Sequence, residues 1–174
     1  MDNMHDVSLV SLTTAHAQAT YRWLCSPDIQ RDIGLRNRPS LEKSIAYANR
    51  TMCDSTISAY AILLDNVHVG NAILDLIDSY IKKARLHIYI GEPSARGKGI
   101  GKKSVRILLS IAFLELELNK IWLTVHPSNV RAIHTYVSIG FILEGIHRDE
   151  FLLNGEFVSE IYMGILKKEF SNYV

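Results

Sequence analysis

The sequence predicts one α/β domain built on a mixed, mostly antiparallel twisted sheet flanked by helices. Short apolar runs that alternate with polar residues recur along the chain, a pattern typical of strands. Asp65-Asn66 joins two such runs and favours a hairpin. A longer run, Val105 to Leu118, repeats apolar residues at helical spacing. With 174 residues, the chain is expected to form a single domain, residues 1–174, with enough material for a real core.

In the N-terminal half, the pattern predicts a strand, two helices and the hairpin. Thr14 can cap the first helix, and Ser26-Pro27-Asp28 ends it after Leu24. Ser40 is a suitable N-cap for the second helix. The expected ranges are 7–12 for the strand, 14–24 for the first helix, 28–32 for a helical turn, 34–39 for a loop, 40–53 for the second helix, and 59–64 with 67–77 for the hairpin.

In the C-terminal half, strands and helices alternate. The expected ranges are 81–90 for a strand, 105–118 for a helix, 121–125 for a strand, 128–139 for a helix, and 141–148 with 157–166 for two strands. Asn154-Gly155 precedes the last of these and is a good hairpin turn.

The composition describes an ordinary soluble protein, with 48% hydrophobic and 21% charged residues. The net charge of +1 argues against a nucleic-acid partner. No apolar run is long enough to span a bilayer, so no membrane association is expected. The polar segment Met1–Asp6 has no signal-peptide pattern, and Cys25 and Cys53 are far apart without metal-ligand spacing. We therefore expect a cytoplasmic protein with reduced thiols and no metal site.

The most informative segment runs from Arg96 to Arg106. It places three glycines at alternate positions among five basic side chains, after the strand that ends near Ile90 and before the long amphipathic helix. Glycines let a ligand approach the backbone, and the first turn of a helix offers unpaired N–H groups and a dipole that favours anions. The segment predicts a phosphate or pyrophosphate site. Its spacing fits neither a Walker loop nor a dinucleotide fingerprint.

Two motifs resemble the GNAT acetyltransferase superfamily. The first is Arg96-x-x-Gly99-x-Gly101, and the second is Asn129-x-x-Ala132-x-x-x-Tyr136-x-x-x-Gly140-Phe141. The resemblance covers about residues 61–166 and is nearest to the small-molecule and ribosomal-protein N-acetyltransferases. It implies that acetyl-CoA is the cosubstrate and that the acetyl group passes directly to a primary amine.

The resemblance also implies roles for individual residues. The backbone of Ile88, Tyr89 and Ile90 would pair with the pantetheine amides, as an added strand does. Asn129 would hydrogen-bond the pantetheine region, and Tyr136 would protonate the departing thiolate. The glycine segment would hold the pyrophosphate through Arg96, Gly97, Lys98, Gly99, Gly101 and Lys102.

The general base is less well defined. Many relatives have a glutamate where this chain has Thr124, which cannot act as a base at neutral pH. His126 is our candidate, and His87 is an alternative, although a lone histidine is more often structural. A water chain that leads to bulk solvent is a further route for the proton.

The acceptor site is expected between the first strand and the hairpin. Arg31, Arg36 and Arg38 make that region basic, and Trp23 adds an aromatic surface. These residues suit an anionic amine, most simply a nucleotide-linked amino sugar. They are explained equally well as surface residues. The alternatives are a polyamine or protein N-terminal acceptor and a non-catalytic acyl-CoA-binding module. A homodimer is also allowed.

Overall fold

The computed structural model describes residues 6–153 and 155–170. Met1–His5 and Asn154 of the predicted turn lie outside these ranges. The strands are β1 (Val7–Ser11), β2 (Ser58–Leu64), β3 (Val67–Asp78), β4 (Lys83–Ile90), β5 (Lys120–Val125), β6 (Ile142–Leu153) and β7 (Glu156–Leu166). The helices are η1 (Thr14–His16), α1 (Ala17–Leu24), α2 (Pro27–Asp32), α3 (Leu41–Thr51), η2 (Pro93–Ala95), α4 (Ile100–Ser110), η3 (Ile111–Glu115), α5 (Val130–Val137) and α6 (Lys167–Phe170).

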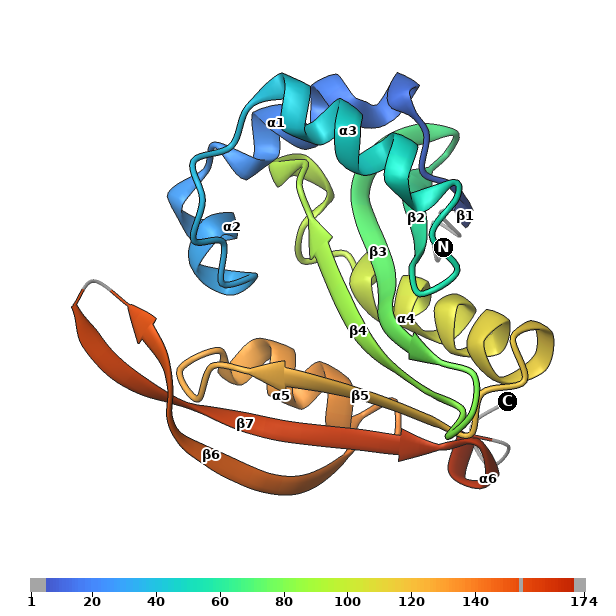
Figure 1. Ribbon diagram of the computed structural model, residues 1–174, viewed down its shortest axis with the longest axis vertical. Helices are drawn as coiled ribbons and strands as arrows, with labels where there is room; N and C mark the ends of the chain where they lie inside the picture. The colour runs from blue at the N-terminus through green and yellow to red at the C-terminus, as the bar shows by residue number, and fades with distance from the viewer. Residues whose placement is uncertain (1–5, 154, 171–174) are drawn as a thin grey trace.

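The strands form one twisted sheet in the order β1-β2-β3-β4-β5-β7-β6 (Figure 1). Every neighbouring pair is antiparallel except β4 and β5, which run parallel. The prediction of a mixed, mostly antiparallel sheet flanked by helices is therefore confirmed. The β2–β3 hairpin turns at Asp65 and Asn66, whose φ angles of 48° and 64° are those of a tight turn that matches the twist of the strands.

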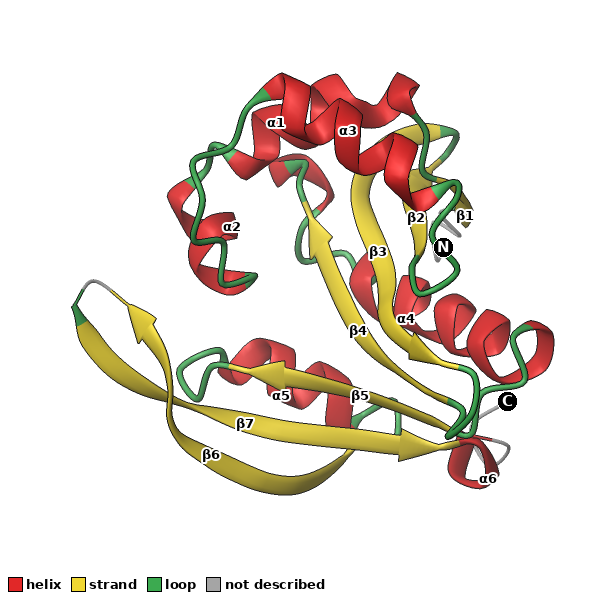
Figure 2. Ribbon diagram, viewed as in Figure 1, coloured by secondary structure: helices red, strands yellow, loops and turns green. Residues whose placement is uncertain are grey.

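Helices cover both faces of the sheet (Figure 2). On one face, α1 and α3 pack together over β2 and β3, and a small apolar cluster around Ala59, Ala61 and Tyr47 joins them to the sheet. On the other face, α4 buries Leu108 and Leu109 against Ile121 and further apolar side chains of the central strands. Burying each such side chain contributes about 1.5–3 kcal/mol, so this layer is the principal core.

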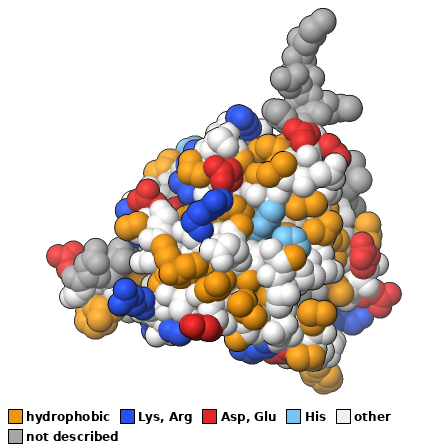
Figure 3. All heavy atoms as spheres, turned by 90° about the horizontal axis from the view of Figure 1, so that it is seen from above, with side chains coloured by type: hydrophobic (Ala, Val, Ile, Leu, Met, Phe, Trp, Pro, Cys, Tyr) orange, Lys and Arg blue, Asp and Glu red, His pale blue; other side chains and the backbone are white. Residues whose placement is uncertain are grey.

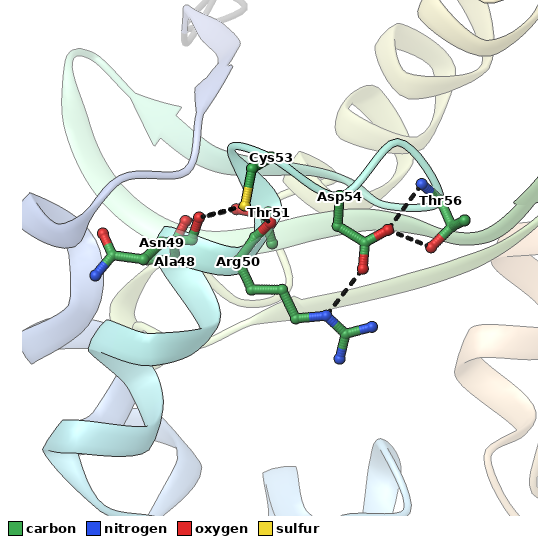
Figure 4. A network of polar contacts seen from close by, with 7 residues as sticks. All are labelled: Ala48, Asn49, Arg50, Thr51, Cys53, Asp54 and Thr56. Carbon is green, nitrogen blue, oxygen red and sulfur yellow. Dashed lines mark hydrogen bonds and ion pairs between the residues drawn. The ribbon is translucent and has the colours of Figure 1, made fainter.

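The connection from α3 to β2 is held by local polar contacts (Figure 4). Arg50 Nε donates to Asp54 Oδ2 at 2.9 Å, and Asp54 Oδ1 accepts from both the backbone N–H and the hydroxyl of Thr56. Those bonds, from Thr56 first and then from Arg50, lower the pKa of Asp54. The Cys53 thiol points back to the carbonyl oxygens of Asn49 and Arg50. Both cysteines of the described residues, Cys25 and Cys53, are exposed free thiols.

Three elements differ most from the sequence prediction. The first helix is divided into η1 and α1, and the N-cap of η1 is Thr13 rather than Thr14. The long helix ends at Ser110, and the chain continues as a π-helix over Ile111–Glu115, with the N–H of Leu116 bonded to the carbonyl of Ile111. Phe113, in this π-helix, is fully buried. The strand β6 continues to Leu153, because β7 pairs with it up to the hairpin. Among the described residues, no helix is long and apolar enough to cross a membrane.

The feature that positions the site is a fork between β4 and β5. The two strands pair only from Lys83 with Lys120 to Arg85 with Trp122, and then they separate, as Figure 1 shows. From Leu86 onward, the edge of β4 that faces β5 has no strand partner. Backbone N–H and C=O groups strongly favour being paired, so this edge is prepared for a ligand.

Candidate active site

A groove of about 440 Å³ lies at this fork and is walled by four parts of the chain. The strand β4 forms one wall, and the glycine segment at the start of α4 forms the end that would take a phosphate. The helix α5 lies on the β5 side, and α2 lies across the entrance. The principal lining residues are Asp28, Ile29, Arg31, Asp32, Ile88, Tyr89, Ile90, Arg96, Gly97, Gly99, Gly101, Lys102, Thr124, Asn129, Arg131, Ala132, Thr135 and Tyr136.

The glycine segment forms the predicted turn into a helix. Gly97 and Gly99 have φ angles of 81° and 75°, in the left-handed region that favours glycine, and Gly99 is the N-cap of α4. The first helical bond is from the N–H of Lys103 to the carbonyl of Gly99. Within the described residues, the N–H groups of Gly99, Gly101 and Lys102 have no acceptor. They form the positive end of the helix dipole, which suits a phosphate.

The basic residues of the segment differ in their surroundings. The Arg96 guanidinium bonds the carbonyls of Ile90 and Gly91, at 2.9 and 3.3 Å, so it fastens the loop to the end of β4 as well as lining the groove. Lys102 lines the groove, whereas Lys98 is exposed and lies outside the lining.

All three predicted β4 residues, Ile88, Tyr89 and Ile90, line the groove. The Tyr89 hydroxyl accepts a 2.7 Å hydrogen bond from the amide of Asn71, which is 1% exposed. The same amide donates to Thr20 in α1, and burial raises the pKa of Tyr89 to about 12. This hydrogen-bond network connects the β4 wall of the groove to α1.

The helix α5 brings Asn129 and Tyr136 to the opposite side. Asn129 Oδ1 accepts from the N–H of Ala132 at 3.2 Å and caps the helix, and the residue lines the groove. Tyr136 packs on Phe141, with 5.5 Å between ring centroids. No group of the described residues hydrogen-bonds its hydroxyl. Burial, and then the negative charge of Asp32, raise the pKa of Tyr136 to about 12.

The entrance helix α2 brings two carboxylates and one arginine to the groove. Arg31 lies 3.1 Å from Asp28 and 3.7 Å from Asp32, so its positive charge is shared between two acids. From the sequence, Arg31 was expected to bind an anionic acceptor, and the alternative of a surface helix paired the arginines with these two aspartates. Their spacing of four residues, which puts both carboxylates on one side of a helix, is the sequence feature that could have identified them as a pair at the site.

The other predicted acceptor residues do not assemble into a phosphate site. Trp23 is 4% exposed and packs edge-on against His68, and Gly91 lies so close to its ring that a Cβ there would collide. Trp23 is therefore a core residue and cannot stack on a ligand. The Arg36 guanidinium lies over the Phe151 ring, 4.7 Å from its centroid, and Arg38 is exposed outside the lining.

The structure does not support His126 as a base. Its Nδ1 accepts the backbone N–H of Ser128 at 3.1 Å and lies 2.6 Å from the Ser128 hydroxyl. Those contacts occupy the lone pair that a base needs. Thr124 lines the groove. Arg131 and Thr135 also line the groove. Apart from their positions within the α5 motif, nothing in the sequence identified them as site residues.

The surface charge is mixed. On the face that carries α1 and α3, basic and acidic side chains are interspersed among apolar ones (Figure 3). This pattern agrees with the net charge of +1 and gives that face no broad basic surface of the kind that nucleic acids need.

A forked sheet with a glycine-capped helix at the fork defines a site for an extended, phosphate-bearing ligand. The chain belongs to the GNAT acetyltransferase family, because the family model described as "Acetyltransferase (GNAT) domain" matches residues 6–142. The match covers most of the chain and includes the glycine segment, Asn129 and Tyr136.

Several known proteins are similar to the chain. The spermidine N(1)-acetyltransferase of Escherichia coli K12 is 29% identical over 117 residues, which cover 67% of this chain and 62% of that protein. The aminoglycoside N(6')-acetyltransferase type 1 of Klebsiella pneumoniae is 28% identical over 156 residues, 82% of this chain and 78% of that protein. The aligned part therefore spans about three fifths of the first relative's length and about four fifths of the second's.

The fold has close counterparts among solved structures. The spermidine N-acetyltransferase of Vibrio cholerae, in complex with CoA and spermine, superposes with a TM-score of 0.89 at 24% identity, over 95% of this chain and 98% of that one. At this level of identity, the similarity establishes the fold.

Proposed function

We propose that the protein is an acetyl-CoA-dependent N-acetyltransferase that acetylates a primary amine on a small polycationic molecule, most simply a polyamine. The observation that carries the proposal is the groove itself. One continuous surface joins the unpaired edge of β4, the open N–H groups at the start of α4, and Tyr136 on α5. Family membership supplies the reaction class.

The chemistry assigned to the groove follows from its parts. The edge of β4 would pair with the pantetheine amides, and the N–H groups of Gly99 and Gly101 would bind the pyrophosphate. Tyr136 keeps its proton at neutral pH because its pKa is about 12. It would protonate the thiolate as the C–S bond breaks. A phenolate at this site is disfavoured by burial, so it would quickly recover a proton from the nitrogen of the tetrahedral intermediate.

The acceptor proposal rests on the charges around α2. Asp28 and Asp32 line the entrance, and Asp32 acts electrostatically on Tyr136. An ammonium group carries the same charge as the Arg31 guanidinium and can share those carboxylates. The relatives are named for spermidine and for aminoglycosides, both of which carry several amino groups. These observations favour the polyamine alternative over a nucleotide-linked amino sugar.

The test is an acceptor panel assayed by thiol release from acetyl-CoA. It would contain spermidine, spermine, an aminoglycoside, a nucleotide-linked amino sugar and an N-terminal peptide. We expect the highest kcat/KM for spermidine or spermine. A higher value for the nucleotide-linked amino sugar would refute the cationic acceptor. Tight coenzyme A binding without acetylation of any amine would support a non-catalytic module instead.

A substitution at the entrance sharpens this test. Asp32→Asn removes one negative charge near the acceptor, so the KM for spermidine should rise by about tenfold. The control is Glu115→Gln, which removes an exposed carboxylate in η3, outside the groove lining, and should leave KM unchanged. An equal effect of the two substitutions would mean that only the net charge of the protein matters.

A further inference from the structure

Asp75 and His87 form a cross-strand pair beside the groove. His87 Nε2 lies 3.5 Å from Asp75 Oδ2, and the two side chains are 31% and 22% exposed. The pair arises from the register of β3 and β4, in which Ile73 faces His87 and Asp75 faces Arg85. Arg85 holds the same carboxylate with two hydrogen bonds of 2.9 and 2.8 Å. Asp75 is therefore fixed in position and turned toward the histidine ring.

The pair stands at the fork of the sheet. Arg85 and Trp122 are the last partners of the β4–β5 pairing, and the Arg85 guanidinium lies 5.6 Å from the Trp122 ring centroid, so their side chains share one face. His87 and Thr124 each follow two residues later on their strands. Side chains two residues apart point to the same face, so both belong to that face where the strands separate. Thr124 lines the groove, and His87, which is not among the lining residues, lies on the same face of the facing strand.

We infer that His87, oriented by Asp75, is the group that accepts the proton from the attacking ammonium. This inference rests on the proposed function. Because Nε2 is the ring nitrogen nearest Asp75, the neutral ring would carry its proton there, and the lone pair of Nδ1 would be available. No group of the described residues hydrogen-bonds Nδ1. A base oriented by a carboxylate is a recurrent arrangement in enzyme sites.

The proton balance of the step is as follows. The R–NH₃⁺ group of the acceptor gives one proton to Nδ1 of His87, which forms an imidazolium beside the Asp75 carboxylate and leaves R–NH₂. The amine nitrogen attacks the thioester carbon, a C–N bond forms, and the C–S bond breaks. The second proton leaves the nitrogen and reaches sulfur through Tyr136. The imidazolium then releases its proton to solvent.

The charged groups around the pair fit this role. Burial acts to raise the pKa of Asp75, but the hydrogen bonds from Arg85 and His87 outweigh it and hold that pKa well below its usual range. Asp75 is therefore ionised at neutral pH. From α3, Tyr47 faces the pair, and its own pKa is raised to about 12, by burial first and then by Asp75. Glu160 and Tyr162 of β7 act on Arg85.

The other candidates lack this arrangement. The Nδ1 of His126 is occupied by Ser128. Thr124 carries a hydroxyl with no basic character at neutral pH. Histidine is also the side chain whose ordinary pKa lies near neutrality, which suits a general base.

The test compares three histidine variants, His87→Gln, His126→Gln and His134→Gln, with the wild-type protein. His134 is exposed on α5 and lies outside the groove lining, so it is the matched control. With the best amine of the acceptor panel, kcat/KM at about pH 7 should fall by about 10²-fold in His87→Gln only. The deficit should shrink as the pH approaches the pKa of the amine, because neutral amine then needs no base. Imidazole should restore part of the rate of His87→Ala.

Calorimetry with coenzyme A separates a loss of the base from a loss of the fold. We expect unchanged affinity in His87→Gln, because His87 is outside the cosubstrate groove. Full activity in His87→Gln, or a rate loss that neither imidazole nor high pH reverses, would overturn the assignment and leave the proposed function intact. If the wild-type protein acetylates no amine, the proposed function fails and the role of His87 fails with it.

Discussion

Tyr136 is the residue whose surroundings most restrict its chemistry. It packs on Phe141, its pKa is raised by burial first and then by Asp32, and no described group hydrogen-bonds its hydroxyl. A tyrosine that served only for packing would not need a free hydroxyl at the groove. Its position therefore suits transient contact with the sulfur of the cosubstrate.

Replacing Tyr136 by phenylalanine tests this role. The ring and its contact with Phe141 would remain, so the fold and coenzyme A affinity should be preserved. Without the phenolic proton, kcat should fall by about 10²-fold, the lower end for acid–base catalysis. Stopped-flow or steady-state thiol release would measure kcat, and calorimetry would measure affinity. A variant with wild-type kcat would make Tyr136 a packing residue.

At the scale of elements, the start of α4 carries the phosphate-site prediction. Gly101 lies in the first turn with ordinary backbone angles, and a Cβ there would only touch Ile90 at 3.9 Å. Gly101→Glu should therefore fold well, since glycine is a weak helix former. It should nevertheless lower coenzyme A affinity at least tenfold, or 1.4 kcal/mol, by placing a negative charge at the phosphate position.

Gly101→Gln is the control for this substitution. It adds similar bulk without charge, so its affinity in calorimetry should lie between those of the wild-type protein and Gly101→Glu. Equal affinities for all three proteins would move the phosphate site away from α4.

The contacts of Asp75 in β3 with Arg85 and His87 in β4 should make a contribution to the free energy of unfolding that depends on pH. Because the pKa of Asp75 is depressed in the folded state, its carboxylate stabilises the fold fully above about pH 4, the ordinary aspartate value. That contribution is lost as the pH falls from there toward the depressed value. Asp75→Asn should lower the free energy of unfolding by about 2 kcal/mol at neutral pH, the size expected for hydrogen bonds to a charged group.

Urea unfolding at several pH values would measure this difference. It should be constant from about pH 7 to pH 5 and should shrink below about pH 4. A difference that stays constant down to about pH 3 would mean that the ionised carboxylate is not what stabilises the pair.

The sequence predicted the elements and the glycine turn at the start of α4 better than the surroundings of the residues expected to bind the acceptor. The glycine segment is local, since its spacing, its place after a strand and the helix that follows are all visible in one stretch. Trp23 was misassigned because the burial of a residue near a helix end depends on Gly91 and His68, which are distant in sequence. The Asp75–His87 contact depends on the register between β3 and β4, which the alternation of apolar and polar residues in the sequence does not determine.

At the scale of the whole molecule, the fork divides the sheet into two parts, β1–β4 and β5–β7–β6, that share only a short parallel pairing. The groove between them is lined from both sides. A ligand that pairs with β4 and also contacts α5 would therefore link the two parts, and its binding energy would add to the cohesion of the fold.

Coenzyme A should consequently raise the thermal stability of the protein. At a concentration of about 100 times Kd, the gain is about 2.7 kcal/mol, or roughly 5–10 °C in Tm for a domain of this size. ADP and pantetheine, each at the same concentration as coenzyme A, reach only one part of the groove and should shift Tm much less. Hydrogen exchange would locate the effect. The N–H of Gly91 bonds to Val69 of β3, and bonding alternates along an antiparallel pair, so the N–H groups of Ile88 and Ile90 point to the open edge of β4. These two groups should gain protection with coenzyme A and little with ADP, because only the pantetheine arm offers them an acceptor. Equal protection by the two ligands would place pantetheine outside the fork.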